Sequence, residues 1–449
     1  MNITVGFDVT FMNARDKVGG IFQYAERLIS MLVSHTGMNI VAMVPAQDGN
    51  IFESLKGYPN FKEIPIGISA LFSEIVEREN IEVIHRPLQY YRRCTLSVPM
   101  IITLHDIQHF HYPEFFTDEK IKFRNIFYKR SAEFSERVIV SFNHVKEDLI
   151  KFYGIPFNKI DICGVGMEEP KSLNPSILQG IKNKYEIPES YLFYAANTWR
   201  HKNHINLIKA LRIVHDKYQQ KISLVCTGQK TQDFFPEIEK EINKLALNGV
   251  VKFLGYIPEE EMLLIMSNAT LVVIPTLYEA GSYPLLEAMT YSVPVICSSV
   301  TSLPEHIGDS RFIFDPHNVD GIAEKINLML IDEKLRKENI ENSRRQIDKI
   351  KWEEKVWTFV ESYRKAIDGF NRKKRDISFP FSEFVCNYEF LLNSYYENIL
   401  NKREDIIKRK DEIIKSKDEK IQRKEEIIRS MQKSLSWRIT ELLRKLAKL

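Results

Sequence analysis

The sequence predicts an α/β protein with two parallel-sheet lobes and a helical tail, and three observations lead to this expectation. Short apolar runs alternate with helical stretches, as in ITVGFD, NIVAMVP, EVIH, MIITLH and RVIVSF, and this alternation is typical of a parallel sheet covered by helices. The chain has 449 residues, which exceeds one ordinary core and favours two domains. Its final stretch is highly charged and free of Gly and Pro, which indicates helix outside the lobes.

The composition indicates a globular protein that works without nucleic acid. Apolar residues make up 44% and charged residues 27% of the chain, and the net charge is only +3. The cysteines form no C-x-x-C pair, which favours buried thiols in a reducing compartment; they are Cys94, Cys163, Cys226, Cys297 and Cys386. The N-terminus lacks the pattern of a signal peptide and no apolar run could cross a bilayer, so we expect a cytoplasmic protein.

We place the domain boundaries where the composition changes. The first lobe covers 1–168 and closes with KIDICGVG, and the stretch EEPKSLNPS that follows has the composition of a linker. The second lobe covers 169–370, and the tail covers 371–449. Apolar residues from Trp352 to Phe370 recur at helical spacing and predict an amphipathic helix at the end of the second lobe.

Candidate site residues in the first lobe follow predicted strands. Gly19 and Gly20 precede a helix whose apolar side carries Ile21, Tyr24, Ala25, Leu28 and Leu32. Two glycines let backbone approach a ligand closely, although the pair alone favours a flexible turn. His105 and Asp106 end the strand MIITLH and could reach into a cleft, although neighbouring backbone could satisfy them; His85, His109 and His111 have weaker claims.

The stretch TLYEAGSYPLLEAMTYSVPVICS, 276–298, predicts a strand end, a turn, a helix and a second strand. Glu279 should project from the carboxyl end of its strand, where open α/β sheets place ligands. Pro284 suits the first turn of a helix, whose N-terminus attracts an anion such as phosphate. Glu287 follows Glu279 with seven residues between them. Each carboxylate alone could be structural, one closing a turn and the other complementing the helix dipole.

This spacing resembles the E-x7-E signature of glycosyltransferase family 4, whose members are retaining enzymes with the GT-B fold of two Rossmann-like lobes that face a cleft. FLGYIPEEEMLLIMSNATLVVIPT, 253–276, is also similar to the family, and the resemblance spans about 1–370. It implies that the helix from Trp352 crosses back to the first lobe. Ser282 and Ser292 depart from the family, because many relatives carry Gly at these positions.

The resemblance assigns roles around a nucleotide-sugar donor. Glu279 would contact the donor sugar and Glu287 the ribose, with His105 at the sugar edge. The turn after YLFYAA carries Arg200 and Lys202, which would hold the diphosphate, whereas without the family a basic turn could simply be solvated. The remaining implied donor-binding residues are Gly19, Gly20, Gly281, Ser282 and Tyr283.

The expected activity is retaining transfer of a hexose to a lipid-linked or surface polysaccharide such as O-antigen. GDP-mannose is the favoured donor, and UDP-hexoses are the alternative donors. The chain contains no D-x-D motif, so we expect no metal and no cofactor beyond the donor. A GT-B sugar epimerase is one alternative. A catalytically silent, membrane-bound coiled-coil scaffold is another, which the two serine departures favour.

The tail combines two patterns. Ile407, Ile414, Ile421 and Ile428 recur every seven residues, with Ile406, Ile413 and Ile427 beside them, which favours a coiled coil and a homo-oligomer over a single charged helix. SLSWRITELLRKLAKL then predicts a helix with an apolar face and a basic face, which suits an anionic membrane surface or a partner protein. Similar segments end surface-polysaccharide glycosyltransferases, and this resemblance favours peripheral attachment at the inner face of the cell membrane.

Overall fold

The computed structural model describes residues 3–12, 20–46, 51–67, 72–91, 97–373, 415–417, 419–430 and 435–447. The chain divides into two compact units, Met1–Asp376 and Ile377–Leu449. The first unit holds two parallel sheets, each with its own apolar core, so the predicted architecture of two Rossmann-like lobes is confirmed.

The described part of the first lobe is built on a seven-stranded parallel sheet of order β3-β2-β1-β4-β5-β6-β7. The strands are β1 (Thr4–Asp8), β2 (Asn39–Pro45), β3 (Phe61–Ile66), β4 (Val83–Arg86), β5 (Met100–Thr103), β6 (Arg137–Val140) and β7 (Ile160–Ile162). The sequence predicts all of them except β3 and β7, the two edge strands. β3 escapes the apolar pattern because an edge strand tolerates the charges and the proline of FKEIPI.

The described part of the first lobe also contains four α-helices. They are α1 (Gly20–His35), α2 (Phe72–Arg78), α3 (Asp118–Phe134) and α4 (Asn143–Asp148). In α1 most of the predicted apolar side is buried, with Tyr24, Ala25, Leu28 and Leu32 each at most 3% exposed, whereas Ile21 in the first turn is only half-buried. α1 therefore presents its opposite side, which carries polar residues, away from the sheet.

The described part of the second lobe is built on a six-stranded sheet of order β10-β9-β8-β11-β12-β13, all pairs parallel. The strands are β8 (Tyr191–Ala195), β9 (Ser223–Thr227), β10 (Val251–Phe253), β11 (Leu271–Ile274), β12 (Val295–Ser298) and β13 (Ile313–Phe314). The helices are α5 (Leu178–Tyr185), α6 (His204–Asp216), α7 (Phe235–Lys244), α8 (Glu259–Ser267), α9 (Tyr283–Thr290), α10 (Leu303–Ile307), α11 (Val319–Ile331) and α12 (Glu333–Ile347). β8 and β11 occupy the centre of this sheet, so their carboxyl ends lie side by side.

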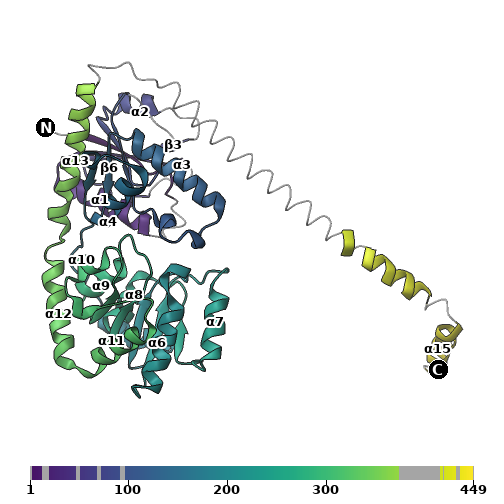
Figure 1. Ribbon diagram of the computed structural model, residues 1–449. Helices are drawn as coiled ribbons and strands as arrows, with labels where there is room; N and C mark the ends of the chain where they lie inside the picture. Colours follow the sequence, from purple (N-terminus) through teal and green to yellow (C-terminus); the bar gives the residue numbers. More distant parts are fainter. Residues whose placement is uncertain are drawn as a thin grey trace. The chain divides into compact units, whose positions relative to one another are not determined.

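The long helix α13 (Trp352–Lys373) returns from the second lobe to the first, as the resemblance implies, and Figure 1 shows it beside α1. Its buried side chains Trp352, Phe359 and Tyr363 belong to the core of the first lobe. Tyr363 Oη lies 2.9 Å from Nδ1 of His85, which is fully buried and therefore structural. The two segments that connect the lobes lie side by side, because Met167 N of the first donates a hydrogen bond to the carbonyl of Ile350 in the second over 2.8 Å.

The described part of the tail contains helix 419–430 and α15 (Leu435–Leu446). Ile421, Ile427 and Ile428 are 54%, 59% and 53% exposed, so this single chain leaves them without a packing partner. On α15 the apolar side chains of Ile439, Leu442, Leu443 and Leu446 are also exposed. The other isoleucines of the repeat lie outside the described residues, and the coiled coil stays a prediction. No helix among the described residues is both long and apolar enough to span a bilayer.

The described cysteines fit the expected thiol chemistry. Cys163, Cys226 and Cys297 are free and buried, and burial raises the pKa of each thiol. Cys94 and Cys386 lie outside the described residues.

Candidate functional site at the lobe interface

The turn between β11 and α9, residues 275–282, is held by two neighbouring loops. We call it the donor turn after the role that the family resemblance implies for it. Leu277 N and Thr276 Oγ1 donate to the carbonyl of His201 over 2.7 and 3.0 Å. Thr301 Oγ1 donates to the carbonyl of Glu279 over 2.6 Å. These contacts fix Glu279 at the carboxyl edge of the second sheet, where the sequence placed it.

Lys202 and Glu279 form a close ion pair on this edge. Lys202 Nζ lies 2.6 Å from Glu279 Oε2, and the two side chains are only 15% and 13% exposed. The lysine backbone is held in place because Tyr194 Oη donates to the carbonyl of Lys202 over 3.0 Å. The structure therefore brings together a carboxylate and a cation that the sequence assigned to different parts of the donor.

Arg200 takes a different direction from Lys202. Its guanidinium pairs with Glu237 on α7 and lies over the ring of Phe234, 4.5 Å from the centroid. The Arg200 side chain is 48% exposed. The two predicted diphosphate-binding cations thus share a turn, but of the two only Lys202 contacts the candidate carboxylate.

Helix α9 begins at Tyr283 with Pro284 in its first turn, as the sequence predicts. Glu287 lies one turn further on and is 8% exposed. Burial raises the pKa of Glu287, and the neighbouring Arg27 of α1 counteracts this rise. Arg27 Nη2 lies 3.8 Å from Glu287 Oε1, and the guanidinium carbon lies 4.6 Å from the Tyr283 ring centroid. Both candidate carboxylates therefore have a cationic neighbour.

The two lobes touch at Gly281. A Cβ atom on Gly281 would lie 2.7 Å from Cε2 of Phe142, a first-lobe residue between β6 and α4. Only glycine allows this approach, because real Cβ contacts are almost never so short. The ring of Phe142 in turn packs edge-on against His306 of α10, with centroids 5.1 Å apart. The donor turn is thus part of the contact between the lobes.

His105 follows β5 and lies against α1. Its Nε2 is 3.2 Å from the carbonyl of Pro87, and its ring meets Tyr24 edge-on with centroids 4.8 Å apart. Burial lowers the pKa of His105, so the neutral ring donates from Nε2 and leaves Nδ1 as an acceptor. The family resemblance implies that His105 lies at a sugar, but it leaves open which ring nitrogen is available. Asp106 shapes the loop by accepting a hydrogen bond from Gln108 N over 3.0 Å.

The remaining candidates of the first lobe have local roles or lie outside the described residues. His109 Nε2 lies 2.9 Å from Asn125 Oδ1, and His111 Nε2 lies 2.7 Å from Asp148 Oδ2. Gly20 is the first residue of α1, and a Cβ atom there would meet nothing within 4 Å. Packing therefore does not require a glycine at position 20. Gly19 lies outside the described residues.

Ser282 and Ser292, the two departures from the family, differ in their surroundings. Ser282 precedes α9 and its side chain makes no capping hydrogen bond. Ser292 has a left-handed backbone with φ of 58°, a conformation that glycine adopts without strain. Its Oγ accepts a hydrogen bond from Arg344 Nε over 3.1 Å. Serine at position 292 therefore strains the backbone, where glycine would not, and it accepts a hydrogen bond from α12.

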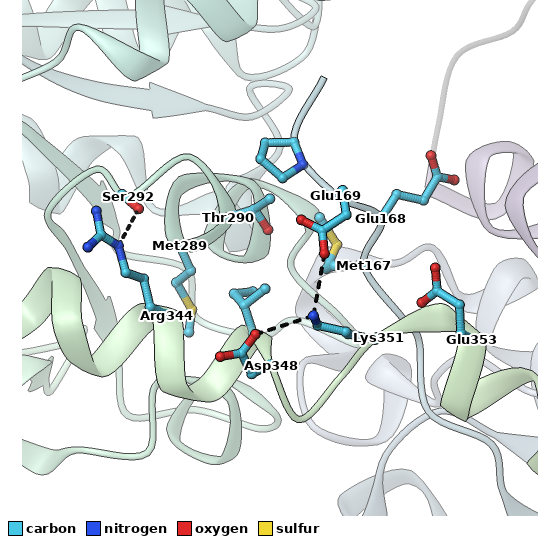
Figure 2. A pocket seen from close by; sticks show the side chains of 12 residues that line it. Met167, Glu168, Glu169, Met289, Thr290, Ser292, Arg344, Asp348, Lys351 and Glu353 are labelled. Carbon is cyan, nitrogen blue, oxygen red and sulfur yellow. Dashed lines mark hydrogen bonds and ion pairs between the residues drawn. The ribbon is translucent and has the colours of Figure 1, made fainter. Parts of the chain in front are cut away.

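A cavity of about 300 Å³ lies beside the linker between the lobes, and Figure 2 shows the side chains that line it. Its wall contains the ion pairs of Lys351 with Glu169 and Asp348, 3.4 and 3.5 Å long. Met289 and Thr290 at the end of α9 also line it. None of the candidate donor residues does, so this cavity is separate from the donor turn. In the described part of the chain, no three His, Cys, Asp or Glu side chains gather to hold a metal ion.

Sequence reasoning missed Arg27 and Phe142. Arg27 is a single basic residue on the polar side of an amphipathic helix, and Phe142 is one of many aromatic residues near a strand end. Each of them belongs to the site because it contacts a residue of the other lobe that is more than a hundred residues away in sequence. No local pattern could have found them.

Two family models match the chain, one for each lobe. Residues 18–167 match Glycosyltransferase Family 4, and residues 179–346 match Glycosyl transferases group 1.

Curated relatives of known name are similar to parts of the chain. O-antigen chain mannosyltransferase B of Escherichia coli is 25% identical over 270 residues, which are 59% of this chain and 70% of the relative. O-antigen chain mannosyltransferase RfbU of Salmonella typhimurium is 28% identical over 229 residues, which are 50% of this chain and 60% of the relative. The serotype-specific mannosyltransferase WbdA of Escherichia coli is matched over only 31% of its length at 27% identity.

Solved structures share the fold at low identity. A glycosyltransferase from Rickettsia africae superposes with a TM-score of 0.63 at 16% identity, over 82% of this chain and 99% of that one. Sucrose-phosphate synthase from Thermosynechococcus elongatus gives a TM-score of 0.64 at 17% identity, over 81% and 99%. These likenesses concern the arrangement of the two lobes.

Proposed function

Because the chain belongs to the GT-B glycosyltransferases of family 4, we propose that it transfers a mannosyl group from a nucleotide sugar to a surface polysaccharide of the O-antigen kind. The observation that supports this most is the donor turn at the lobe interface, with Glu279 at its centre and Glu287 one helical turn beyond it. The names of the similar mannosyltransferases favour mannose and an O-antigen acceptor.

In the proposed reaction the donor lies along the carboxyl edge of the second sheet. Glu279 accepts hydrogen bonds from hydroxyls of the transferred sugar, and Nδ1 of the neutral His105 accepts another at the sugar edge. Glu287 binds the ribose. Gly281, Ser282 and Tyr283 supply the backbone around the sugar and the start of α9.

Lys202 and Arg200 offset the negative charge of the departing nucleoside diphosphate. The Lys202 ammonium is already placed beside Glu279, at the point where negative charge develops as the glycosidic bond breaks. Arg200 is half exposed and can leave Glu237 for a phosphate, since an exposed ion pair contributes at most about 1 kcal/mol. Two protein cations fit a reaction without a metal ion, with retention of the anomeric configuration as in the family.

We also propose that the tail brings this activity to the cytoplasmic face of the membrane. α15 leaves the side chains of Ile439, Leu442, Leu443 and Leu446 exposed, and its last turn carries Arg444 and Lys445. Such a helix binds anionic lipid surfaces, where a lipid-linked acceptor would reside. Pairing of the preceding helices between chains would place several catalytic units on one membrane patch.

The central test combines a donor panel with one substitution. Binding of GDP-mannose and UDP-hexoses is measured by calorimetry, followed by transfer to a lipid-extracted acceptor with and without chelator. We expect transfer that survives the chelator and is abolished by Glu279→Ala with the fold intact by circular dichroism. Glu239→Ala, an exposed acid on α7, is the matched control and should transfer normally.

Other outcomes identify the alternatives. Release of an epimerised sugar without any acceptor would identify an epimerase. Donor binding without transfer, and cell-surface glycan that Glu279→Ala leaves unchanged, would identify a scaffold. Removal of residues 430–449 should reduce membrane partitioning while leaving turnover on a short soluble acceptor, and unchanged partitioning would contradict the proposed anchor.

A further inference from the structure

Helix α1 of the first lobe sends one basic side chain into the second lobe. Arg27 lies almost two turns after Gly20, where α1 begins, and its side chain is 20% exposed. It stacks on Tyr283, the first residue of α9, and its Nη2 is directed at the carboxylate of Glu287. Tyr283 itself packs against the cores of both lobes. The contact therefore joins α1 to the helix that carries the second acid of the E-x7-E pattern.

The surroundings of Glu287 make this contact electrostatically important. Burial disfavours the charged carboxylate and raises its pKa, whereas Arg27 favours the charged form. Two other charges act more weakly, since Glu259 of α8 raises the pKa and Lys171 of the linker lowers it. Arg27 is the cation that forms an ion pair with Glu287 among the described residues. Without it, a buried carboxylate facing Glu259 would tend to take up a proton.

We propose that Arg27 is a positioning residue that acts through Glu287: by pairing across the lobe interface it keeps this carboxylate ionised and oriented for the hydroxyls of the donor ribose. This inference rests on the proposed function, which places the ribose at Glu287. An ionised carboxylate accepts hydrogen bonds from two neighbouring hydroxyls, whereas a protonated one must donate at one of its oxygens. The charge state of Glu287 therefore sets the affinity for the donor.

Arginine suits this position better than lysine would. The guanidinium carbon of Arg27 lies over the ring of Tyr283 while its Nη2 lies 3.8 Å from Glu287 Oε1, so this extended group contacts the ring and the carboxylate at the same time, which a compact ammonium does less well. The same helix also supports the other end of the donor site, because Tyr24 of α1 packs against His105. One rigid element thus sets the positions of a group at the proposed sugar and a group at the proposed ribose.

The test measures donor affinity as a function of pH. Dissociation constants for the donor and for GDP and UDP are determined by calorimetry between pH 5 and pH 8 for the wild type, Arg27→Met and Arg27→Lys. Arg130→Met is the matched control, because Arg130 is an exposed first-lobe arginine on α3 that pairs with Glu133 in its own helix. Transfer kinetics with the same proteins give KM and kcat separately.

We expect Arg27→Met to raise the pH midpoint of donor binding by about one unit, because a nearby guanidinium lowers the pKa of a carboxyl by roughly this amount. Donor binding should therefore weaken by up to about tenfold at pH values below both midpoints, and by less as the pH rises above them. KM for the donor should rise more than kcat falls. Arg27→Lys keeps the charge, so its midpoint should stay near that of the wild type even if its affinity drops. Arg130→Met should behave like the wild type.

A double-mutant cycle separates positioning from general damage. Glu287→Gln removes the ionisable group, so adding Arg27→Met to it should change donor affinity less than twofold. Full additivity of the two substitutions would overturn the proposal, as would a loss of affinity in Arg27→Met that is uniform between pH 5 and pH 8. If Arg27→Met does not fold, Arg27→Gln and its combination with Glu287→Gln carry the same test, because glutamine also removes the positive charge. A wild type that binds no nucleotide refutes the proposed function and this inference together, whereas normal binding in Arg27→Met refutes only the inference.

Discussion

Substitution of Gly281 by alanine tests whether the donor turn and the first lobe meet as the structure shows. The added Cβ atom would lie 2.7 Å from Cε2 and 3.0 Å from Cζ of Phe142. Carbon atoms prefer a separation of about 3.5–4.0 Å, so either the ring or the lobe must move by about 1 Å. The ring is 4% exposed and packs against His144 and His306, which leaves it little room to turn.

Overpacking of this kind costs about 1–3 kcal/mol. If the lobes relieve it by moving apart, donor transfer loses the same free energy, and kcat/KM should fall about 5- to 150-fold. Gly180→Ala on α5 is the matched control, because a Cβ atom there would meet nothing within 4 Å. The control should transfer normally and gain up to about 1 kcal/mol of stability.

The readouts are kcat/KM for transfer and the thermal unfolding midpoint, measured for Gly281→Ala alone and together with Phe142→Leu. The smaller side chain removes the clashing ring atoms, so the double variant should recover part of the lost transfer. Wild-type kcat/KM in Gly281→Ala, or no relief by Phe142→Leu, would show that this contact does not exist in the working protein.

Three further substitutions test other parts of the structure. Burial lowers the pKa of His204 to about 3, whereas a histidine in the unfolded chain titrates near 6.5. The unfolded state therefore takes up a proton below about pH 6.5 while the folded state does not, so His204 lowers the free energy of unfolding by about 2 kcal/mol between pH 7 and pH 5. In urea titrations His204→Leu should show a decrease over this pH range that is smaller by about that amount. A decrease of the same size in the variant would contradict the burial of His204. Trp352→Ala should cost about 3–5 kcal/mol because Trp352 is fully buried in the first-lobe core, whereas Trp357→Ala on the same helix, 49% exposed, should change stability by less than about 0.5 kcal/mol in the same urea titrations. Equal effects of these two would argue against docking of α13. Ser292→Gly should stabilise the chain by about 0.5–1 kcal/mol without altering donor turnover, because glycine relieves the left-handed backbone; a destabilised variant would mean that the hydrogen bond to Arg344 outweighs the strain.

Local sequence patterns determined most of the fold. The apolar runs of β1, β5, β8 and β11 are buried central strands whose identity depends only on their own residues, and Pro284 marks the start of α9 without reference to any partner. The spacing of Glu279 and Glu287 belongs to the same class, since both lie within one strand–turn–helix unit. Edge strands such as β3 escaped because their exposed positions carry the charges and prolines of loops.

Only the tertiary structure decided which of these groups meet. Arg200 and Lys202 are two cations of the same turn in the sequence. In the structure Lys202 pairs with Glu279 of the donor turn, whereas Arg200 pairs with Glu237 of α7. Arg27 and Phe142 belong to the site because residues of the other lobe, Glu287 and Gly281, contact them. These pairs are so far apart in sequence that the periodicity of helices and strands cannot predict them. Secondary structure follows from the alternation of neighbouring side chains, whereas the charge state and the packing of a site depend on atoms that folding alone brings within a few ångströms.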